Sequence, residues 1–184
     1  MVVIDRDAHP GDPTFRFAEP PDVAAVVALV ESAYRGETSR VGWTTEADLL
    51  EGQRTDQVAV AELIHSEASH ILLVERDADL VACCHLARSR PDTVYLGLFA
   101  VRPGAQGGGL GTSVVVEAGR LAAEWGASLL RMTVINRRLD LLAWYGRLGF
   151  VLTGEVEPFP YGDKRFGIPT RPDLELVVLQ RPVC

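Results

Sequence analysis

A glycine-rich segment in the middle of the chain has the composition of a binding site for phosphate groups. Residues 101–112 read Val-Arg-Pro-Gly-Ala-Gln-Gly-Gly-Gly-Leu-Gly-Thr, and they join an apolar stretch to a segment with helical periodicity. Glycines allow backbone N–H groups to turn toward a ligand, because no Cβ stands in the way. The free N–H groups in the first turn of a helix, together with the helix dipole, attract phosphate or pyrophosphate. We therefore expect a ligand with an anionic tail at this loop, although a glycine-rich turn without a ligand is the alternative.

Two common phosphate-binding motifs do not fit this segment. A P-loop requires Gly-Lys-Ser/Thr, but Gly111 is followed directly by Thr112, and the only lysine of the chain is Lys164. The dinucleotide-binding fingerprint requires a third glycine where this chain has Val114. The sequence thus argues against both a nucleoside triphosphate and a nicotinamide dinucleotide.

The same segment resembles the acetyl-coenzyme A motif of the GNAT acyltransferase superfamily, Gln-x-x-Gly-x-Gly, through Gln106, Gly109 and Gly111. Asn136 and the run 141–150 are similar to a second segment of that family, an Asn followed by Ala-x-x-Tyr-x-x-x-Gly-Phe. The two segments occur in the family's order, with a predicted helix and a predicted strand between them. The pair is more specific than either motif alone.

The resemblance implies a binding surface for acetyl-coenzyme A. In this family the strand before the glycine loop splays from its neighbour and pairs with the pantetheine arm, while the loop amides take the pyrophosphate. The residues implied in cofactor binding are Phe99, Ala100, Val101, Gln106, Gly107, Gly108, Gly109, Leu110, Gly111, Thr112 and Asn136. For Asn136, a helix cap is the alternative interpretation. Four arginines could also reach the cofactor phosphates, namely Arg102, Arg137, Arg138 and Arg147.

The resemblance also implies a chemical step. Tyr145 matches the family's tyrosine that points at the coenzyme sulfur, so it is expected to act as the general acid that protonates the departing thiolate. A helix tyrosine packed on the sheet is the alternative. A backbone N–H near Leu98 or Phe99 would face the thioester carbonyl. The predicted function is transfer of an acetyl group from acetyl-coenzyme A to an amine by direct attack, with no metal and no covalent acyl-enzyme.

Two segments are expected to form the acceptor side of the site. Residues 34–50 lie where the family's first helices and their loop cover the substrate groove, and residues 155–172 form a loop longer than a compact domain usually carries without a function. This loop carries Phe159, Tyr161, Asp163 and Arg165, which are expected to line or cap the acceptor pocket, and a mobile surface flap is the alternative. The acidic balance of the first 68 residues, with 5 basic and 13 acidic side chains, favours a cationic amine. The residues expected to bind the acceptor are Tyr34, Arg35, Glu37, Trp43, Glu46 and Tyr161.

The proton acceptor for the amine is left open by the sequence. Many relatives carry a carboxylate on the strand before the loop, and residues 95–101 contain none. The candidates are Glu37, Glu46 and Asp48, or a water chain that passes His85. The alternative function is a non-catalytic acyl-coenzyme A binding module, which would keep the glycine loop without an acid and a base. The predicted partner is a small-molecule or peptide amine, and a homodimer, common in the family, is a possible assembly.

The elements that must position these residues follow from periodicity. Strands at 71–75, 80–87 and 94–101 predict an antiparallel meander. Further strands are expected at 14–18, 129–134, 150–153 and 174–179, and helices at 20–34, 56–68, 110–125 and 140–148, with another helix capped by Thr45. The predicted fold is α/β (α+β), with a mixed, mostly antiparallel twisted sheet and helices on both faces. The family resemblance adds a splayed central strand pair.

Length and composition limit the remaining possibilities. The 184 residues, 47% of them hydrophobic, fit a single domain spanning 1–184. A formal charge of −7 argues against nucleic acid, and no apolar run reaches the roughly 18 residues of a membrane span, so we expect a cytoplasmic protein. Cys83 and Cys84 are adjacent and are expected to be buried, reduced thiols.

Overall fold

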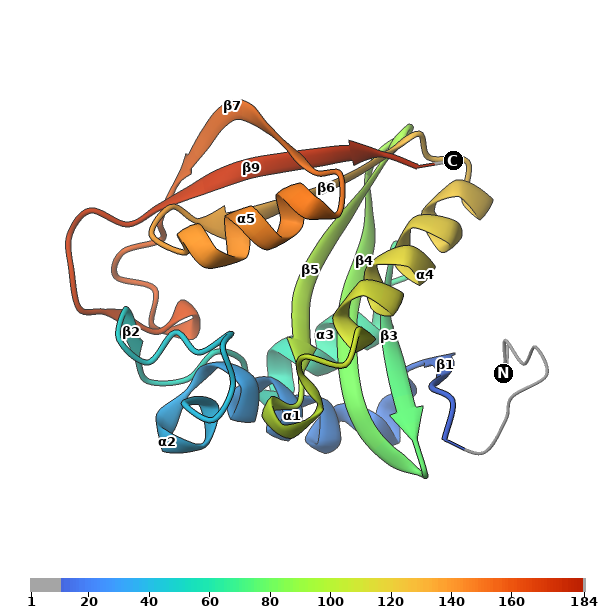
Figure 1. Ribbon diagram of the computed structural model, residues 1–184, viewed down its shortest axis with the longest axis horizontal. Coiled ribbons are helices and arrows are strands. Elements are labelled where there is room, and N and C mark those ends of the chain that lie inside the picture. Colours follow the sequence, from blue (N-terminus) through green and yellow to red (C-terminus); the bar gives the residue numbers. More distant parts are fainter. Residues whose placement is uncertain (1–10, 184) are drawn as a thin grey trace.

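The computed structural model describes residues 11–183, and a seven-stranded sheet forms its centre (Figure 1). In spatial order the strands are β1 (Thr14–Phe17), β3 (Ser69–Arg76), β4 (Asp79–Arg90), β5 (Thr93–Val101), β6 (Leu129–Ile135), β9 (Glu175–Pro182) and β7 (Val151–Pro158). Every neighbouring pair is antiparallel except β5 and β6, which run parallel. The mixed, mostly antiparallel sheet predicted from the sequence is confirmed.

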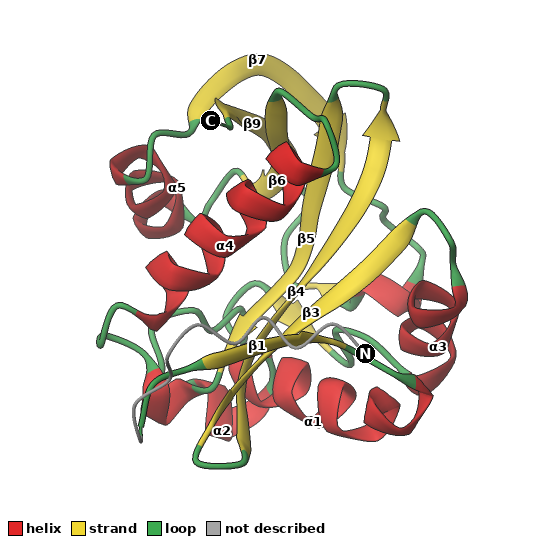
Figure 2. Ribbon diagram, turned by 90° about the vertical axis from the view of Figure 1, so that its right-hand side faces the viewer, coloured by secondary structure: helices red, strands yellow, loops and turns green. Residues whose placement is uncertain are grey.

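Helices cover both faces of this sheet (Figure 2). One face carries α1 (Val23–Tyr34), α2 (Gly36–Ser39) and α3 (Gln57–His65), and the other carries α4 (Leu110–Glu124) and α5 (Leu139–Arg147). Short 3-10 turns lie at Pro20–Asp22, Pro103–Ala105 and Lys164–Phe166. No helix in residues 11–183 is long and apolar enough to cross a membrane.

The two-residue period of the strands divides the core between these faces. Along β3, Leu72 and Val74 pack with α4, whereas Ile71 and Leu73 pack with α1 and α3. All four side chains are essentially inaccessible to solvent. Because successive side chains of a strand point to opposite faces, an uninterrupted apolar run is required in a strand that is covered on both sides.

Two irregularities in β5 create the space for a site. β5 and β6 are paired only through Thr93–Tyr95 and Leu129–Arg131, after which the strands separate. On the β4 side, Cys83 faces Ala100 and His85 faces Gly97, so two residues of β5, 98 and 99, stand opposite one residue of β4. This is a β-bulge, and Leu98 has a φ of +42°, a conformation that non-glycine residues rarely adopt. The splayed strand pair is thereby confirmed.

A second, two-stranded sheet joins the two segments expected on the acceptor side. β2 (Leu50–Glu51) pairs with β8 (Ile168–Pro169), and the Thr170 amide donates to the Leu49 carbonyl at 3.0 Å. In Figure 1 these segments lie together at one end of the molecule, beyond α2. Segments that are about 120 residues apart in sequence therefore form one wall.

The structure corrects two local expectations in these segments. No helix begins at Thr45, because its hydroxyl bonds to Ser39 Oγ at 2.6 Å and accepts the Ala47 amide at 3.2 Å, which turns the chain toward β2. The loop expected over 155–172 is shorter, since β7 continues to Pro158 and is paired there with β9.

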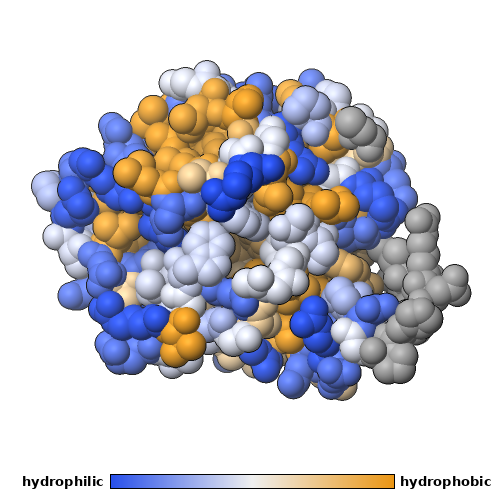
Figure 3. All heavy atoms as spheres, viewed as in Figure 1, coloured by the Kyte–Doolittle hydropathy of each residue, from blue (hydrophilic) through white to orange (hydrophobic). Residues whose placement is uncertain are grey.

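Apolar side chains remain exposed on the edge strand β7 and at the start of α5. They are Leu139, Val151, Leu152 and Val156. Figure 3 shows apolar surface gathered over the upper part of this face, where Figure 1 places α5 and β7.

Candidate active site

The glycine loop opens onto a cavity of about 620 Å³ between the start of α4 and α5. Gly109 is the residue before α4 and has a φ of +82°, and no side chain caps this helix end. A Cβ built at Gly107 or Gly109 would meet no atom within 4 Å, so the backbone here borders open space. An uncapped N-terminus of a 15-residue helix that faces a cavity fits the phosphate groups of a coenzyme.

Gln106 is fully engaged within the protein. Its Oε1 accepts the Trp43 amide, and its Nε2 donates to Thr44 Oγ1 and to the Val101 carbonyl, each at 2.9 Å. A Cβ at Gly42 would lie 2.7 Å from Gln106 Oε1, so a larger residue there would force the Gln106 side chain to shift. Gln106 thus joins the end of β5 to the 42–44 loop and shapes the cavity wall.

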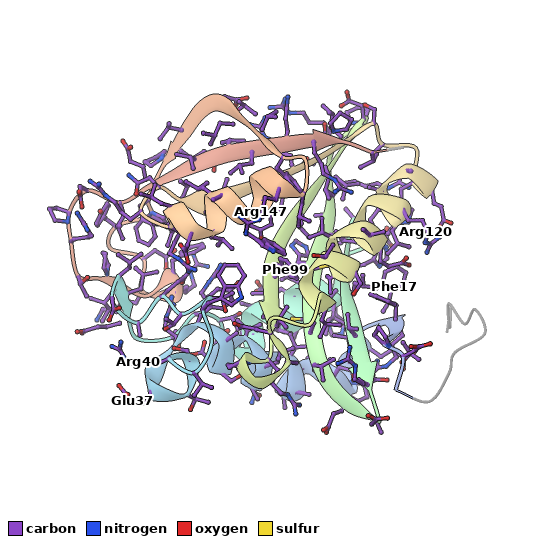
Figure 4. The ribbon with its side chains drawn as sticks, viewed as in Figure 1. Phe17, Glu37, Arg40, Phe99, Arg120 and Arg147 are labelled. Carbon is purple, nitrogen blue, oxygen red and sulfur yellow. The ribbon has the colours of Figure 1, made fainter. Side chains whose placement is uncertain are left out.

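Helix α5 forms the opposite wall of the first cavity. The Trp144 ring meets the Trp43 ring edge-on at 5.8 Å and lies 3.2 Å from where a Cβ of Gly111 would be, so α4 and α5 approach closely. Figure 4 shows Arg147 on α5 and Phe99 on β5 in the opening between α4 and α5. Of the four arginines expected near the phosphates, Arg147 alone lines this cavity.

A second cavity, of about 390 Å³, occupies the splay between β5 and β6. Its walls are largely apolar, and its charged lining side chains are Glu46, Arg54, Arg138 and Glu157. The Tyr95 hydroxyl and Thr133 Oγ1, 3.1 Å apart, bridge the strands close to the point where their pairing ends.

The two cavities share four lining residues, Tyr34, Phe99, Leu141 and Tyr145. Tyr145 is 3% exposed, and burial, followed by the proximity of Tyr34, raises its pKa well above the ordinary value. Its hydroxyl makes no hydrogen bond to any residue in 11–183, while the Tyr34 hydroxyl donates to the Phe99 carbonyl. A protonated, unpaired hydroxyl therefore lies where the cavities meet.

A buried ion pair lies behind this junction. Arg35 Nη1 donates to Glu46 Oε2 at 2.7 Å, and both side chains are over 90% buried. Arg54 Nε lies 3.8 Å from the same oxygen, and the Arg54 guanidinium stands 5.6 Å from the centre of the Tyr34 ring. The Glu46 amide bonds to the Tyr34 carbonyl, which fixes this carboxylate beside the tyrosine.

The residues expected to bind the cofactor fall into two groups. Seven line the first cavity: Phe99, Val101, Gln106, Gly107, Gly109, Gly111 and Thr112. Ala100 and Leu110 are buried in the core, and Gly108 is exposed but outside the lining. Asn136 lies away from both cavities, because its Nδ2 donates to the Asp173 carbonyl at 3.1 Å and fastens the chain before β9.

The residues expected to bind the acceptor are also divided. Tyr34 and Glu46 line the second cavity, with Arg35 behind Glu46, whereas Trp43 lines the first cavity. Glu37 is exposed and paired with Arg40. Tyr161 lies outside both cavities, since its hydroxyl donates to the Arg171 carbonyl and accepts the Leu174 amide.

Among the candidate proton acceptors, only Glu46 reaches a cavity wall. Asp48, like Glu37, is exposed and paired with Arg40. His85 is on β4 and lines neither cavity. Its Nε2 is 2.8 Å from Ser69 Oγ, and burial lowers its pKa to about 4. Cys83 and Cys84 are free and buried as predicted, and burial raises the pKa of Cys83 to about 12. Neither thiol is therefore set up as a nucleophile.

Three lining residues carried no usable signal in the sequence. Arg54 and Phe166 line the second cavity, and Asp140 lines the first. Arg54 and Phe166 lie near the sheet of β2 and β8, which only the tertiary structure reveals. Phe159, expected from its aromatic loop, does line the second cavity.

Comparisons with known proteins agree with this geometry. Residues 27–150 match the model of the acetyltransferase (GNAT) family. No curated protein sequence matches the chain significantly.

Solved structures share the fold at low sequence identity. Ard1 from Thermoplasma volcanium is 18% identical, with a TM-score of 0.69 over 94% of this chain and 98% of that one. A ribosomal-protein-alanine N-acetyltransferase from Brucella melitensis is 20% identical, with a TM-score of 0.68 over 91% and 98%. The yncA protein of Salmonella typhimurium, solved with acetyl-CoA, is 19% identical, with a TM-score of 0.68 over 94% and 95%. Because the family model covers more than half of its length, the chain belongs to the acetyltransferase (GNAT) family.

Proposed function

We propose that this protein is an N-acetyltransferase that moves an acetyl group from acetyl-coenzyme A to a primary amine in a ternary complex. The observation that carries the proposal is that two cavities of suitable size meet at Tyr34, Phe99, Leu141 and Tyr145. The first cavity takes the coenzyme and the second takes the amine. Direct attack requires both reactants at one junction, because proximity replaces a covalent intermediate.

The coenzyme supplies an activated acetyl thioester, and this chain's residues hold it by its phosphates and its arm. We assign the pyrophosphate to the amides of Gly107, Gly109, Gly111 and Thr112 at the start of α4. Arg147 makes no ion pair or hydrogen bond to another residue in 11–183, and it lines the same cavity. Its guanidinium is thus available to a phosphate.

The β-bulge provides donors for the thioester carbonyl. Leu98 and Phe99 have no register partner in β4, and β6 has already separated from β5 at this point. Their backbone N–H groups lie beside the junction, and we assign one of them as the donor to the thioester carbonyl. A donor aimed at the oxygen that gains negative charge contributes roughly 3 to 4 kcal/mol to the rate.

Tyr145 is assigned as the general acid. Its raised pKa keeps the hydroxyl protonated at neutral pH, and this hydroxyl has no competing partner in the described chain. As the C–N bond forms and the C–S bond breaks, the electron pair of that bond goes to sulfur. The Tyr145 proton then converts the leaving group to a thiol.

Glu46 is assigned as the group that receives the ammonium and takes its proton, directly or through one water. An amine of pKa about 10.4 must lose a proton at pH 7, which costs about 4 to 5 kcal/mol. Glu46 lines the second cavity beside Tyr34, while Glu37 and Asp48 face away from it.

The comparisons support the reaction class and leave the acceptor open. One neighbour is a ribosomal-protein-alanine N-acetyltransferase, and another, from Bacillus cereus, is an IAA acetyltransferase. The homodimer and the cytoplasmic location expected from the sequence stay predictions.

Release of free thiol from acetyl-coenzyme A in the presence of an amine panel tests the proposal. We expect amine-dependent release and a mass increase of one acetyl group on the acceptor. The alternative, a non-catalytic acyl-coenzyme A binding module, would bind acetyl-coenzyme A in calorimetry and release no thiol with any amine.

A further inference from the structure

The second cavity is lined by two arginines and two carboxylates, and the two arginines differ in their hydrogen bonding. Arg138 is compensated, because its guanidinium bonds to Asp140 and to the carbonyls of Trp43 and Thr44. Glu157 lies on β7 near Arg131, and the pKa of Arg131 is raised mainly by the hydrogen bonds that it donates to Glu155 and in smaller part by the charge of Glu157. These two charges of the lining therefore have partners outside the cavity.

Glu46 is the one carboxylate that remains for two guanidinium groups. Arg35 holds its Oε2 at 2.7 Å, so Arg54 Nε, at 3.8 Å from that oxygen, is too distant for a hydrogen bond. Glu31 does not neutralise Arg54 either, because its Oε1 accepts the backbone amides of Arg54 and Thr55 at 2.6 and 2.9 Å. Within residues 11–183 the Arg54 side chain donates no hydrogen bond, although it lines the cavity and is only 28% exposed.

Arg54 is nevertheless held in place beside the reaction centre. Its guanidinium lies over the ring of Tyr34, and the hydroxyl of the same ring bonds to the carbonyl of Phe99 in the bulge. One tyrosine ring therefore separates this guanidinium, which donates no hydrogen bond within residues 11–183, from the junction of the cavities. Glu46 lies beside the same ring.

We propose that the acceptor of the N-acetyltransferase assigned above is a free α-amino acid with an apolar side chain, whose carboxylate binds Arg54 while its ammonium group faces Glu46. An α-amino acid carries its amine and its carboxylate on one carbon, which matches a cation and an anion that lie 3.8 Å apart next to one tyrosine. A planar guanidinium suits a carboxylate because it can donate two parallel hydrogen bonds. The apolar side chain fits Leu50, Phe159 and Phe166.

This inference revises the cationic acceptor expected from the sequence. The acidic excess of the first 68 residues does not reach the cavity, since Glu37 and Asp48 are exposed and paired with Arg40. An amine that carries only positive charge would bring a second cation next to Arg54 and leave the Arg54 N–H groups without a hydrogen-bond acceptor.

Three amines with the same isobutyl side chain test the proposal with the wild-type protein, and they differ in carrying a carboxylate, an amide or neither. They are L-leucine, L-leucinamide and 3-methylbutylamine, and acetyl-coenzyme A is the donor. We expect kcat/KM for leucine to exceed that for the other two by at least about 10-fold, the size of a charge-assisted hydrogen bond. The amide amine is less basic than that of leucine, so amine basicity alone would favour the amide. Equal kcat/KM for leucine and leucinamide would overturn the proposal.

Variants at Arg54 separate binding from folding. Arg54→Gln should raise the KM for leucine about 10- to 100-fold, change kcat/KM for leucinamide less than about 2-fold, and leave the KM for acetyl-coenzyme A unchanged. Arg54→Lys should restore part of the loss. Arg40→Gln is the matched control, because Arg40 is an exposed arginine outside both cavities. An equal loss for all three acceptors in Arg54→Gln would contradict the role in carboxylate binding.

The proposal can fail independently of the proposed function. If thiol is released with all amines but leucine has no advantage, the transferase assignment stands and the Arg54 site is refuted. If no amine supports thiol release, calorimetric titration of leucine into the coenzyme A complex still tests the site. Binding that is lost in Arg54→Gln supports it, and the absence of leucine binding refutes it.

Discussion

The hydroxyl of Tyr34 donates a hydrogen bond to the carbonyl oxygen of Phe99, so helix α1 on one face of the sheet is tied to the bulge in β5. Tyr34 is 8% exposed, and burial raises its pKa above the ordinary value, which keeps the hydroxyl a donor. The bond therefore holds the backbone of residues 98 and 99 at the junction of the two cavities.

Replacement of Tyr34 by Phe should loosen this junction. The Phe99 carbonyl loses a donor in a buried setting, so the free energy of unfolding should fall by about 1 to 3 kcal/mol, and kcat should fall because the bulge amides lose their support. Denaturant unfolding and steady-state thiol release measure the two effects. Tyr161→Phe is the control. In the wild type the Tyr161 hydroxyl bonds only to the backbone of Arg171 and Leu174, outside both cavities, so its removal should leave kcat unchanged. Unchanged kcat in Tyr34→Phe would contradict the role given to this bond.

Replacement of Tyr145 by Phe should remove activity without removing stability. The hydroxyl has no partner within residues 11–183, so its loss should change the free energy of unfolding by less than about 0.5 kcal/mol. Loss of a general acid should lower kcat by about 100-fold or more, with the Kd of acetyl-coenzyme A unchanged. Calorimetry and thiol release provide both values. A variant with wild-type kcat would remove the assignment of Tyr145 as the acid.

The pH dependence of the wild-type reaction follows from the same raised pKa. Burial keeps the pKa of Tyr145 above its ordinary value of 10.0, so the acid stays protonated at neutral and mildly alkaline pH. The rate should therefore rise with pH as the amine of the acceptor loses its proton, with no decline from Tyr145 below about pH 10. A steady-state profile in which kcat falls between pH 7 and 9 would contradict this.

A comparison of alanine variants at two glycines, one at each end of α4, distinguishes an effect on ligand binding from an effect of backbone strain. Gly109 and Gly126 have φ values of +82° and +79°, and a Cβ at either would meet no atom within 4 Å. Replacement by Ala should cost about 1 to 2 kcal/mol of stability at each, because L-residues avoid this conformation. Only Gly109→Ala should also raise the KM for acetyl-coenzyme A, since Gly126 lies outside both cavities. A similar effect of both on this KM would argue against phosphate binding at the start of α4.

Acid should destabilise the fold through His85. Burial lowers its pKa from 6.5 to about 4, so between these values the unfolded chain binds a proton that the folded chain does not. The free energy of unfolding should thus fall by up to about 3 kcal/mol as the pH drops from about 7 to 4. Urea unfolding at several pH values in this range measures the effect. The free energy of unfolding of His85→Gln should change less with pH than that of the wild type, whereas His65→Gln, at an exposed position, should keep the wild-type pH dependence. Identical slopes for wild type and His85→Gln would contradict the buried neutral imidazole.

Much of the coenzyme side of the site could be predicted from the sequence. The glycine loop and the strand that ends at Val101 are adjacent in sequence, Tyr145 lies in the second segment that resembles the family, and the structure brings these residues to one cavity. The meander and the helices around it followed from periodicity, because each strand or helix has its own apolar pattern. The helix predicted to begin at Thr45 was wrong, because a threonine hydroxyl can cap a turn as well as a helix. Here the Thr45 hydroxyl bonds to the Ser39 hydroxyl and accepts the Ala47 amide.

The acceptor side of the site could not be predicted in the same way, because the positions of its residues depend on contacts between segments that are distant in sequence. Arg54 has no motif, and its position over Tyr34 arises from the packing of the segment before α3 against α1. Glu37 and Glu46 look alike in the sequence, yet one is exposed and the other is buried against Arg35. Asn136 and Tyr161 both fasten the chain before β9 through hydrogen bonds to residues 171–174, which no local pattern could indicate.

The central claim is that the two cavities form one site joined at Tyr34, Phe99, Leu141 and Tyr145. Calorimetric titration of a bisubstrate compound, in which coenzyme A is linked through its sulfur and an acetyl bridge to the amine of leucine, tests this claim directly. A single site predicts a Kd at least about 10-fold lower than that of coenzyme A alone, because the second half binds without a new loss of translational freedom. A Kd no lower than that of coenzyme A would contradict the account.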